Sequence, residues 1–208
     1  MRKVIGIAFV ALGMICLLLA AGLVVYNQLD AKAAEAASDR ILQEVQEMIS
    51  QPTMPPQETE GEEEAPVVEA SGATLERMPA INSGGYNCIG ILSIPVLELE
   101  LPVLDQWNYE KLKKAPCQYF GSCYDGDFVI AAHNYAAHFG RLPELQPGDL
   151  VLFTDAAGEV YCYEVVLRET LPPTATKEMI TSGFDLTLYT CTPGGASRVT
   201  VRCSEITA

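Results

Sequence analysis

The distribution of apolar residues divides the chain into stretches of different character. From Val4 to Tyr26 no charged residue interrupts a run of apolar side chains, and a run of roughly 20 such residues is long enough to cross a bilayer. From Gln28 to Ser50 the sequence lacks Gly and Pro and is rich in Ala, Glu, Gln and Leu, which favours a helix. Beyond residue 83, short strand-like apolar runs are separated by turn residues.

The first apolar run predicts an uncleaved membrane anchor over residues 1–27. The core of a cleaved signal peptide is about 7–15 residues, and this run is longer. Arg2 and Lys3 precede the run and Asp30 follows it, so the positive-inside rule places the N-terminus in the cytoplasm and the remainder of the chain outside the cell. A cleaved signal peptide, with small residues around Ala31 to Ala37 as cleavage sites, is the alternative.

Two connecting segments are expected between the anchor and the folded domain. Residues 28–50 predict a helical stalk. Its apolar residues at helical spacing are Ile41, Val45 and Met48. Residues 51–82 predict a flexible tether, because Pro and clustered Glu give low hydrophobicity with one sign of charge, which cannot offset the entropy of ordering. This acidic run indicates solvation rather than a calcium site, and the tether is expected to give the domain reach.

Residues 83–208 are expected to form one extracellular domain, which is long enough for a single core. The strand-like runs are Ile89–Ile94, Leu97–Val103, Phe128–Ala132, Leu150–Thr154, Val160–Leu167, Leu186–Cys191 and Val199–Cys203. Helical patterns are short and occur at Tyr109–Lys114 and Lys177–Thr181. Many short strands with few helices predict a mainly β fold, a barrel or a sandwich.

The segment from residue 186 to residue 203 has the pattern of a β-hairpin. Two β-rich runs flank a loop that contains Pro193 and two glycines. Cys191 ends the first run, beside the loop. Because side chains alternate across a strand, Arg198 and Arg202 share one face of the second run. The hairpin can therefore bring an arginine beside the thiol, and Arg198 is favoured because it lies nearer the loop.

These residue types point to acyl transfer. The thiolate is the nucleophilic form of cysteine and a neighbouring cation favours it, while a guanidinium offers fixed donors to an oxyanion. A cysteine nucleophile also needs a proton acceptor, usually a histidine. The chain has two, and His133 is favoured over His138 because it ends the apolar run Phe128–Ala132.

The sequence Leu-Thr-Leu-Tyr-Thr-Cys at 186–191, followed by Arg198, resembles the active-site signature of the sortases, the membrane-anchored cysteine transpeptidases of Gram-positive surfaces. The resemblance extends from about Ile89 to the C-terminus. The further segments that carry it are Ile94-Pro95, Leu101-Pro102-Val103, Phe128–Asn134 and Leu145–Asp149. Ala132 stands where glycine is more usual before the histidine. The resemblance implies a closed sortase-type β-barrel of about eight strands with short helices, preceded by one transmembrane helix.

The resemblance also implies site residues and partners. Cys191 would be the nucleophile, His133 the general acid/base and Arg198 the stabiliser of the substrate carbonyl and oxyanion. The substrates would be secreted surface proteins with an LPxTG-like C-terminal sorting motif, joined through a thioacyl-enzyme to an amine of a peptidoglycan precursor or a pilin lysine. No metal or organic cofactor is required, and calcium dependence does not follow from the sequence. A hydrolytic or pilin-polymerising member and an inactive membrane-tethered binding module are the alternatives.

Three further features lie outside the proposed catalytic residues. Leu171–Ala175 resembles a sorting motif, but no apolar span and basic tail follow it, so it is expected to be a loop near the groove. Specificity is expected in the loops 132–142 and 168–184. Trp107 and Tyr109 are expected in core packing or at a helix start, with groove lining as the alternative.

The charge, the spacing of Cys and His, and the order of the candidate catalytic residues argue against other classes of protein. A net charge of -14 disfavours nucleic acid as a partner. Two histidines without C-x-x-C spacing disfavour a zinc site. A papain-like protease is disfavoured because its histidine follows its cysteine. Among the seven cysteines, Cys117 and Cys123 are the candidate disulfide pair. The remaining cysteines, expected within the anchor, in packing or in occasional disulfides, are Cys16, Cys88, Cys162 and Cys203.

Overall fold

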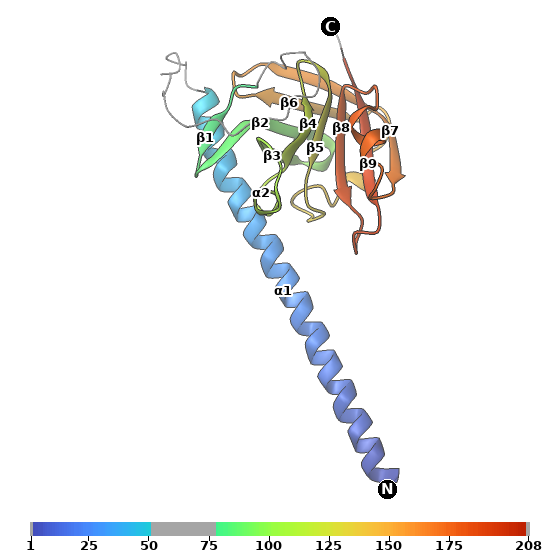
Figure 1. Cartoon of the computed structure of the whole chain (residues 1–208). Helices are drawn as coiled ribbons and strands as arrows, with labels where there is room; N and C mark the ends of the chain where they lie inside the picture. Colours follow the sequence, from blue (N-terminus) through green and yellow to red (C-terminus); the bar gives the residue numbers. More distant parts are fainter. Residues whose placement is uncertain (1, 51–77, 207–208) are drawn as a thin grey trace, which may run out of the picture.

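A computed structural model describes residues 2–50 and 78–206 of the chain, with side chains from residue 12 onward. One long helix, α1 (Arg2–Ser50), precedes a β-rich domain (Figure 1). The strands are β1 (Ile81–Ser83), β2 (Tyr86–Ile94), β3 (Leu99–Leu104), β4 (Cys117–Ser122), β5 (Gly126–Ala131), β6 (Leu150–Asp155), β7 (Val160–Leu171), β8 (Leu186–Cys191) and β9 (Arg198–Glu205). The short helices are η1 (Pro95–Leu97), α2 (Tyr109–Leu112), η2 (Leu142–Glu144) and α3 (Thr176–Ile180).

The nine strands form one sheet that closes on itself. Their order is β1-β2-β3-β4-β5-β8-β9-β7-β6, and a further pairing of β2 with β6 joins the two sides into a ring that leaves only β1 outside it. Most neighbours are antiparallel, but β3 runs parallel to β4, through a single residue pair, and β5 runs parallel to β8. The predicted mainly β fold with short helices behind a long apolar N-terminal helix is confirmed.

Ring closure depends on a close approach of backbones at Gly90. This residue lies at an irregularity in the register of β2 with β3, and it is also paired with Asp155 of β6. A Cβ atom at this position would lie 2.3 Å from the Thr154 carbonyl oxygen. Glycine is therefore the residue that allows β2 to pair on both sides here.

All the predicted strands and both predicted short helices are present, but β1 and β4 were not predicted. The β4 sequence, Cys-Gln-Tyr-Phe-Gly-Ser, lacks β-branched residues and contains a glycine, which weakens the strand pattern. β1 has only three residues. Within the expected tether, residues 51–77 lie outside the described residues, while the chain is already in the sheet at Ile81.

The interior of the ring is filled by apolar side chains from alternate positions of the strands. Among the largest fully buried ones are Leu92, Phe128 and Phe153, and the two phenylalanine rings pack edge to face with centroids 5.0 Å apart. The hairpin strands contribute Leu188 and Val201 to this same core. The alternate residues of β8 and β9 consequently face the outside of the ring.

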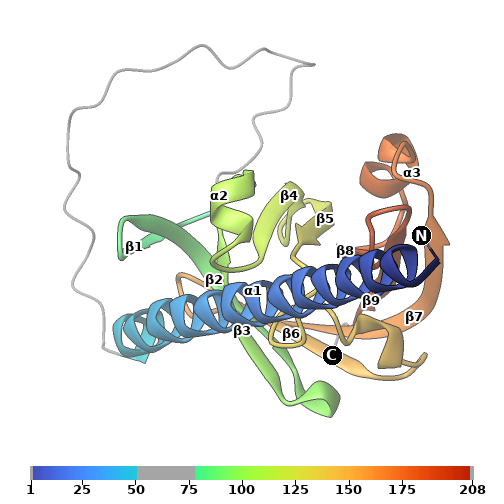
Figure 2. The same cartoon turned by 90° about the horizontal axis from the view of Figure 1, so that it is seen from below.

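Helix α1 packs against the domain through its C-terminal part. Ile41 and Val45 are buried, and they form a second apolar cluster with Cys88, Leu104 and Cys117 of the sheet. Figure 2 shows α1 crossing the domain beside β3. The apolar spacing noted in the predicted helical stalk is the stripe that docks on the sheet, because such a stripe can be covered by a sheet as well as by a partner helix.

The N-terminal part of α1 projects away from the domain (Figure 1). The helix is long and apolar enough to cross a membrane, and the side chains of Leu17, Leu18 and Leu19 are 72%, 69% and 65% exposed. Leucines that no protein surface covers are suited to a lipid environment.

The proposed pairing of Cys117 with Cys123 is wrong. Cys117 begins β4 and Cys123 follows the last residue of that strand, so the strand itself separates them. Cys117 belongs to the cluster under α1 and Cys123 to the core of the ring. Within the described part of the chain every cysteine is a free thiol.

The docking of α1 predicts protection of two thiols. Burial raises the pKa of Cys88 to about 11 and that of Cys117 to about 12, so both are unreactive while the helix covers them. Ile41→Asp places an unpaired carboxylate in the cluster, and we expect it to raise maleimide labelling of Cys88 and Cys117 at least about 10-fold. Peptide mass spectrometry of the full chain in detergent micelles measures the labelling site by site.

The matched control is Met48→Asp, since Met48 lies on the same helix but is 38% exposed. It should leave both thiols protected. Equal protection in the Ile41→Asp chain would contradict the protection of these thiols by α1.

Candidate functional site

The parallel pairing of β5 with β8 brings His133 and Cys191 to the same level of the sheet. The register pairs Ala131 with Tyr189. It continues one residue further, since the Ala132 amide donates to the Tyr189 carbonyl at 3.2 Å and the Thr190 hydroxyl to the Ala132 carbonyl at 2.8 Å. One residue further along both chains, His133 lies beside Cys191 at the ends of the two neighbouring strands.

The antiparallel pairing of β8 with β9 adds Arg198. Cys191 and Arg198 are direct Cα partners at the end of the hairpin, so their side chains leave the same face of the sheet. This confirms the predicted hairpin and its alternation. Both residues are partly exposed, so the thiol and the guanidinium are open to a ligand on the outer face.

The two arginines of β9 have different environments. Arg202 is buried, binds Glu169 Oε1 at 2.8 Å, and donates to the Thr187 hydroxyl and to carbonyls of α3. It pairs with Thr187, four residues before the cysteine on β8. Arg198 instead donates to the carbonyls of Gly195 and Ser197, both at 3.1 Å. Its guanidinium is held over the hairpin loop with no carboxylate partner among the described residues.

The two histidines belong to one loop but differ in access. His133 is partly exposed, and burial lowers its pKa, while the charge of Asp30 opposes that change. His138 is fully buried, and neither ring nitrogen has a hydrogen-bond partner among the described residues. Burial lowers the pKa of His138 to about 4. Of the two imidazoles, that of His133 reaches the surface and that of His138 does not.

The loop that carries both histidines is folded tightly onto itself. The amides of His138 and Gly140 donate to the Tyr135 carbonyl, and the Phe139 amide donates to that of His133. A Cβ at Gly140 would lie 2.6 Å from the Asn134 carbonyl oxygen, so the loop can close only around a glycine. The backbone after β5 is therefore fixed, and with it the position of His133.

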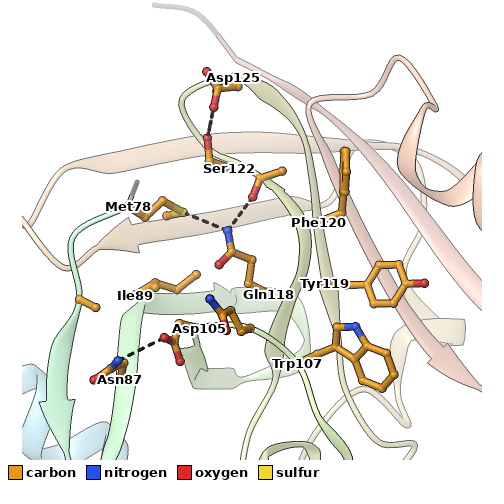
Figure 3. A pocket seen from close by; sticks show the side chains of 13 residues that line it. Met78, Asn87, Ile89, Asp105, Trp107, Gln118, Tyr119, Phe120, Ser122 and Asp125 are labelled. Carbon is orange, nitrogen blue, oxygen red and sulfur yellow. Dashed lines mark hydrogen bonds between the residues drawn. The ribbon is translucent and has the colours of Figure 1, made fainter. Parts of the chain in front are cut away.

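An aromatic path leads from the cysteine to an open groove. Tyr189 lies two residues before Cys191 on the same face, and its ring meets Tyr119 edge to face at 5.3 Å. Tyr119 in turn lies 5.6 Å from Trp107. Figure 3 shows Trp107 and Tyr119 on one side of a groove of about 990 Å³ over β4. Trp107 is therefore a groove residue rather than core packing, whereas Tyr109 is exposed beside it.

Polar groups form the opposite side of the groove, and several already have partners. Gln118 donates to the Gly121 carbonyl at 2.7 Å and the Ser122 hydroxyl donates to Asp125 (Figure 3). Asp105 binds Lys111 at 2.6 Å. Cys191 and His133 are not among its lining residues, so the groove adjoins the candidate site without containing it.

The segment resembling a sorting motif lies beside the site but in a closed conformation. Leu171 ends β7 and pairs with Arg198. The Ala175 amide then donates to the Pro172 carbonyl, which closes a turn, and Ala175 is buried. A segment bound as a substrate would be extended, so this one is a loop near the site, as predicted.

Sequence reasoning missed two residues that adjoin His133. Tyr135 stacks on the His133 ring, with centroids 4.8 Å apart and an interplanar angle of 22°. The Tyr135 hydroxyl donates to the Asp30 carboxylate on α1. Proximity in sequence could have drawn attention to Tyr135, but no local signal links residue 135 to residue 30. In the described ranges no group of His, Cys, Asp and Glu could hold a metal ion.

Known proteins of one family resemble this chain. A family model described as the sortase domain matches residues 92–206, more than half of the chain. Sortase A from Corynebacterium diphtheriae shares 25% identity with a TM-score of 0.54, over 59% of this chain and 62% of that one. The pilus-related sortase C of Group B Streptococcus shares 27% identity with a TM-score of 0.52, over 58% and 68%.

A second structure from that organism, the sortase C2 of pilus island 1, shares 27% identity with a TM-score of 0.52, over 58% of this chain and 74% of that one. This chain therefore spans less than two thirds of the sortase A structure and somewhat more of these two sortase C structures. A search of curated protein sequences gave no match.

The burial of His138 predicts a pH dependence of stability. The ordinary pKa of 6.5 is lowered to about 4 in the folded chain, so between these values the unfolded chain binds a proton that the folded chain excludes. The free energy of unfolding should therefore fall as the pH drops from 6.5 to 4, by up to about 3 kcal/mol from this residue. His138→Phe should remove that part of the slope, measured by urea unfolding with the fluorescence of the single Trp107.

The two chains should differ in slope only below pH 6.5. An unchanged slope in the His138→Phe chain would contradict the assignment of a buried, neutral imidazole.

Proposed function

Since this chain belongs to the sortase family, we propose that it is a cysteine transpeptidase whose nucleophile is Cys191, with His133 as general acid/base and Arg198 as oxyanion stabiliser. The observation that carries the proposal is the strand register. β5 and β9 flank β8, so their pairings bring a histidine, a cysteine and an arginine to one edge of the ring. No cofactor is needed for the proposed chemistry.

The first half of the reaction cleaves a sorting motif. The Cys191 thiolate attacks the carbonyl carbon of the scissile peptide bond, and a C–S bond forms as the carbonyl electrons move to oxygen. The C–N bond then breaks, and the protonated His133 gives its proton to the departing amine. The product is a thioacyl-enzyme, and dividing one difficult step into two is what a covalent intermediate supplies.

The second half transfers the acyl group to an amine. The nitrogen of the acceptor attacks the thioester carbon, His133 takes the proton from that nitrogen, and the C–S bond breaks to regenerate the thiolate. Burial lowers the pKa of His133, which keeps the ring neutral and able to accept a proton at neutral pH. The charge of Asp30 moderates this effect, which helps the ring to hold the proton needed in the first half.

The arginine is suited to the charge that develops between these steps. Its contacts to the Gly195 and Ser197 carbonyls fix the guanidinium at the hairpin end, and the remaining N–H groups are available to an oxygen at the substrate carbonyl. Donors positioned before the reaction need no reorganisation when the oxyanion forms. Arg202 cannot take this role because its guanidinium is already bound to Glu169 and to α3.

The proposed substrates are secreted surface proteins with an LPxTG-like sorting motif, and the proposed acceptor is an amine of a peptidoglycan precursor or a pilin lysine. Membership of the sortase family supports surface-protein or pilin substrates, and similar structures include both a sortase A and pilus-related sortases C. The apolar part of α1 would anchor the chain in the cell membrane, with the N-terminus in the cytoplasm and the β-rich domain outside.

A thioacyl adduct tests the transpeptidase proposal. The full chain in detergent micelles, incubated with a library of sorting-type peptides, should gain the mass of an acyl fragment on Cys191. Added amines of either acceptor class should release the fragment in covalent linkage to the amine. Intact-mass and peptide mass spectrometry measure both steps.

Cys191→Ala should abolish the adduct, and Cys162→Ala, which removes a partly exposed thiol of β7, should leave it unchanged. A folded chain that forms no adduct across the library would favour the inactive binding module. An adduct released only by water would favour a hydrolytic sortase.

The contrast between the two arginines gives a second test. Arg198→Ala should lower the rate of acyl-enzyme formation about 100- to 1,000-fold, the range for loss of an oxyanion donor, with little change in the urea midpoint. Arg202→Ala should lower the midpoint, because it leaves Glu169 and buried carbonyls without their partner. Stopped incubations with mass detection measure the rates. Equal acylation rates in wild type and Arg198→Ala would remove Arg198 from the mechanism.

A further inference from the structure

His133 is in contact with a side chain whose other end is attached to the anchor helix. Tyr135 lies against the imidazole with nearly parallel rings, 4.8 Å apart, so rotation of the imidazole would require displacement of the tyrosine. Tyr135 also packs against His138, with centroids 5.6 Å apart. The tyrosine ring therefore contacts both histidines of one loop.

The hydroxyl of Tyr135 provides the connection to α1. It donates to the Asp30 carboxylate, 105 residues away in the sequence. The contact is partly buried, and burial, together with this hydrogen bond, raises the pKa of Tyr135 to about 12. The phenol consequently remains a donor throughout the physiological pH range.

The position of Asp30 is itself fixed. It is part of an uninterrupted helix whose next turns are docked through Ile41 and Val45, and the Ser83 hydroxyl donates to Glu44 further along. A residue on a docked helix has a defined position relative to the sheet. Asp30 therefore acts as a fixed point for Tyr135 rather than the reverse.

We infer that Asp30 and Tyr135 are positioning residues that hold the His133 ring in its working orientation, so that docking of the anchor helix completes the active site. This inference rests on the proposed function for its catalytic consequence, although the contacts themselves do not. Neither residue touches the reacting atoms. Each acts on the reaction through the imidazole.

The charges around His133 allow the contribution of Asp30 to be measured from the titration of the imidazole. Asp30 from α1 favours the protonated ring, and Lys113, which follows α2, disfavours it. His138 and Tyr135 of its own loop contribute no charge at neutral pH, since the pKa of the first is about 4 and that of the second about 12. Arg198 lies two strands away, at the start of β9. Removal of the Asp30 charge should therefore shift the titration of His133 to lower pH.

The experiment uses the full chain in lipid nanodiscs with ¹³C-labelled histidine, where two imidazoles give two resolved titrations. Asp30→Asn should move the midpoint of His133 down by roughly 0.3–1 unit while that of His138 stays in place. Asp30→Ala and Tyr135→Phe should each lower kcat for acyl transfer about 10-fold, a typical effect of misorientation, with KM little changed. The double variant should be no worse than either single one, since both break the same contact.

Glu44→Gln is the matched control, because it weakens another contact of the same helix far from His133, and it should change neither kcat nor the titration. Asp30→Glu retains a carboxylate for the Tyr135 phenol, so it should keep kcat and the midpoint of the His133 titration near their wild-type values. Unchanged titration and kcat in Asp30→Ala and Tyr135→Phe, or additive losses in the double variant, would overturn the inference.

The outcomes also separate the inference from the proposed function. If the wild-type chain forms no thioacyl adduct but Asp30→Asn shifts the His133 titration and Tyr135→Phe broadens its resonance, the positioning contact stands and the transpeptidase proposal fails. If the adduct forms on Cys191 and both variants are silent, the transpeptidase proposal stands and the positioning role fails.

Discussion

The parallel pairing of β5 with β8 is the constraint on which the site depends. Parallel neighbours bring equivalent ends of two strands to the same edge, and here those ends carry His133 and Cys191. The same ring closes elsewhere, where Gly90 lets β2 pair with both β3 and β6. A site made of three strand ends is thus specified by the whole ring rather than by any local segment.

The sequence predicted the parts of this arrangement that are local. The hairpin, with Cys191 opposite Arg198, followed from alternation and a glycine-rich turn, and the apolar run before His133 identified the strand that delivers it. The docking of α1 could not be read in the same way, because a stripe of Ile41 and Val45 suits a partner helix, a sheet or another chain equally well. The contact of Tyr135 with Asp30 arises only after that docking, so nothing near either residue indicates it.

The environments of the two arginines show how one strand face can serve two purposes. The carboxylate and carbonyls around Arg202 compensate for the loss of water around a buried charge, and they also attach α3 to the sheet. Arg198 is left partly in solvent, with hydrogen bonds that orient it but no counter-ion among the described residues. The pattern of polar neighbours, more than the position in sequence, separates a structural cation from one that can meet a developing negative charge.

Because α1 is one unbroken helix, it also sets how far the β-rich domain lies from the end of the apolar run. A helix rises about 1.5 Å per residue, so Asp30 lies roughly 6 Å beyond Tyr26, where the apolar run ends. Since Asp30 touches the loop of His133, and the hairpin end points toward the same side as the N-terminus of α1 (Figure 1), a membrane-anchored chain would present its strand ends to the lipid headgroups. Such an enzyme would work within a thin layer next to the bilayer, and a peptide bond held farther from the lipid would be out of its range.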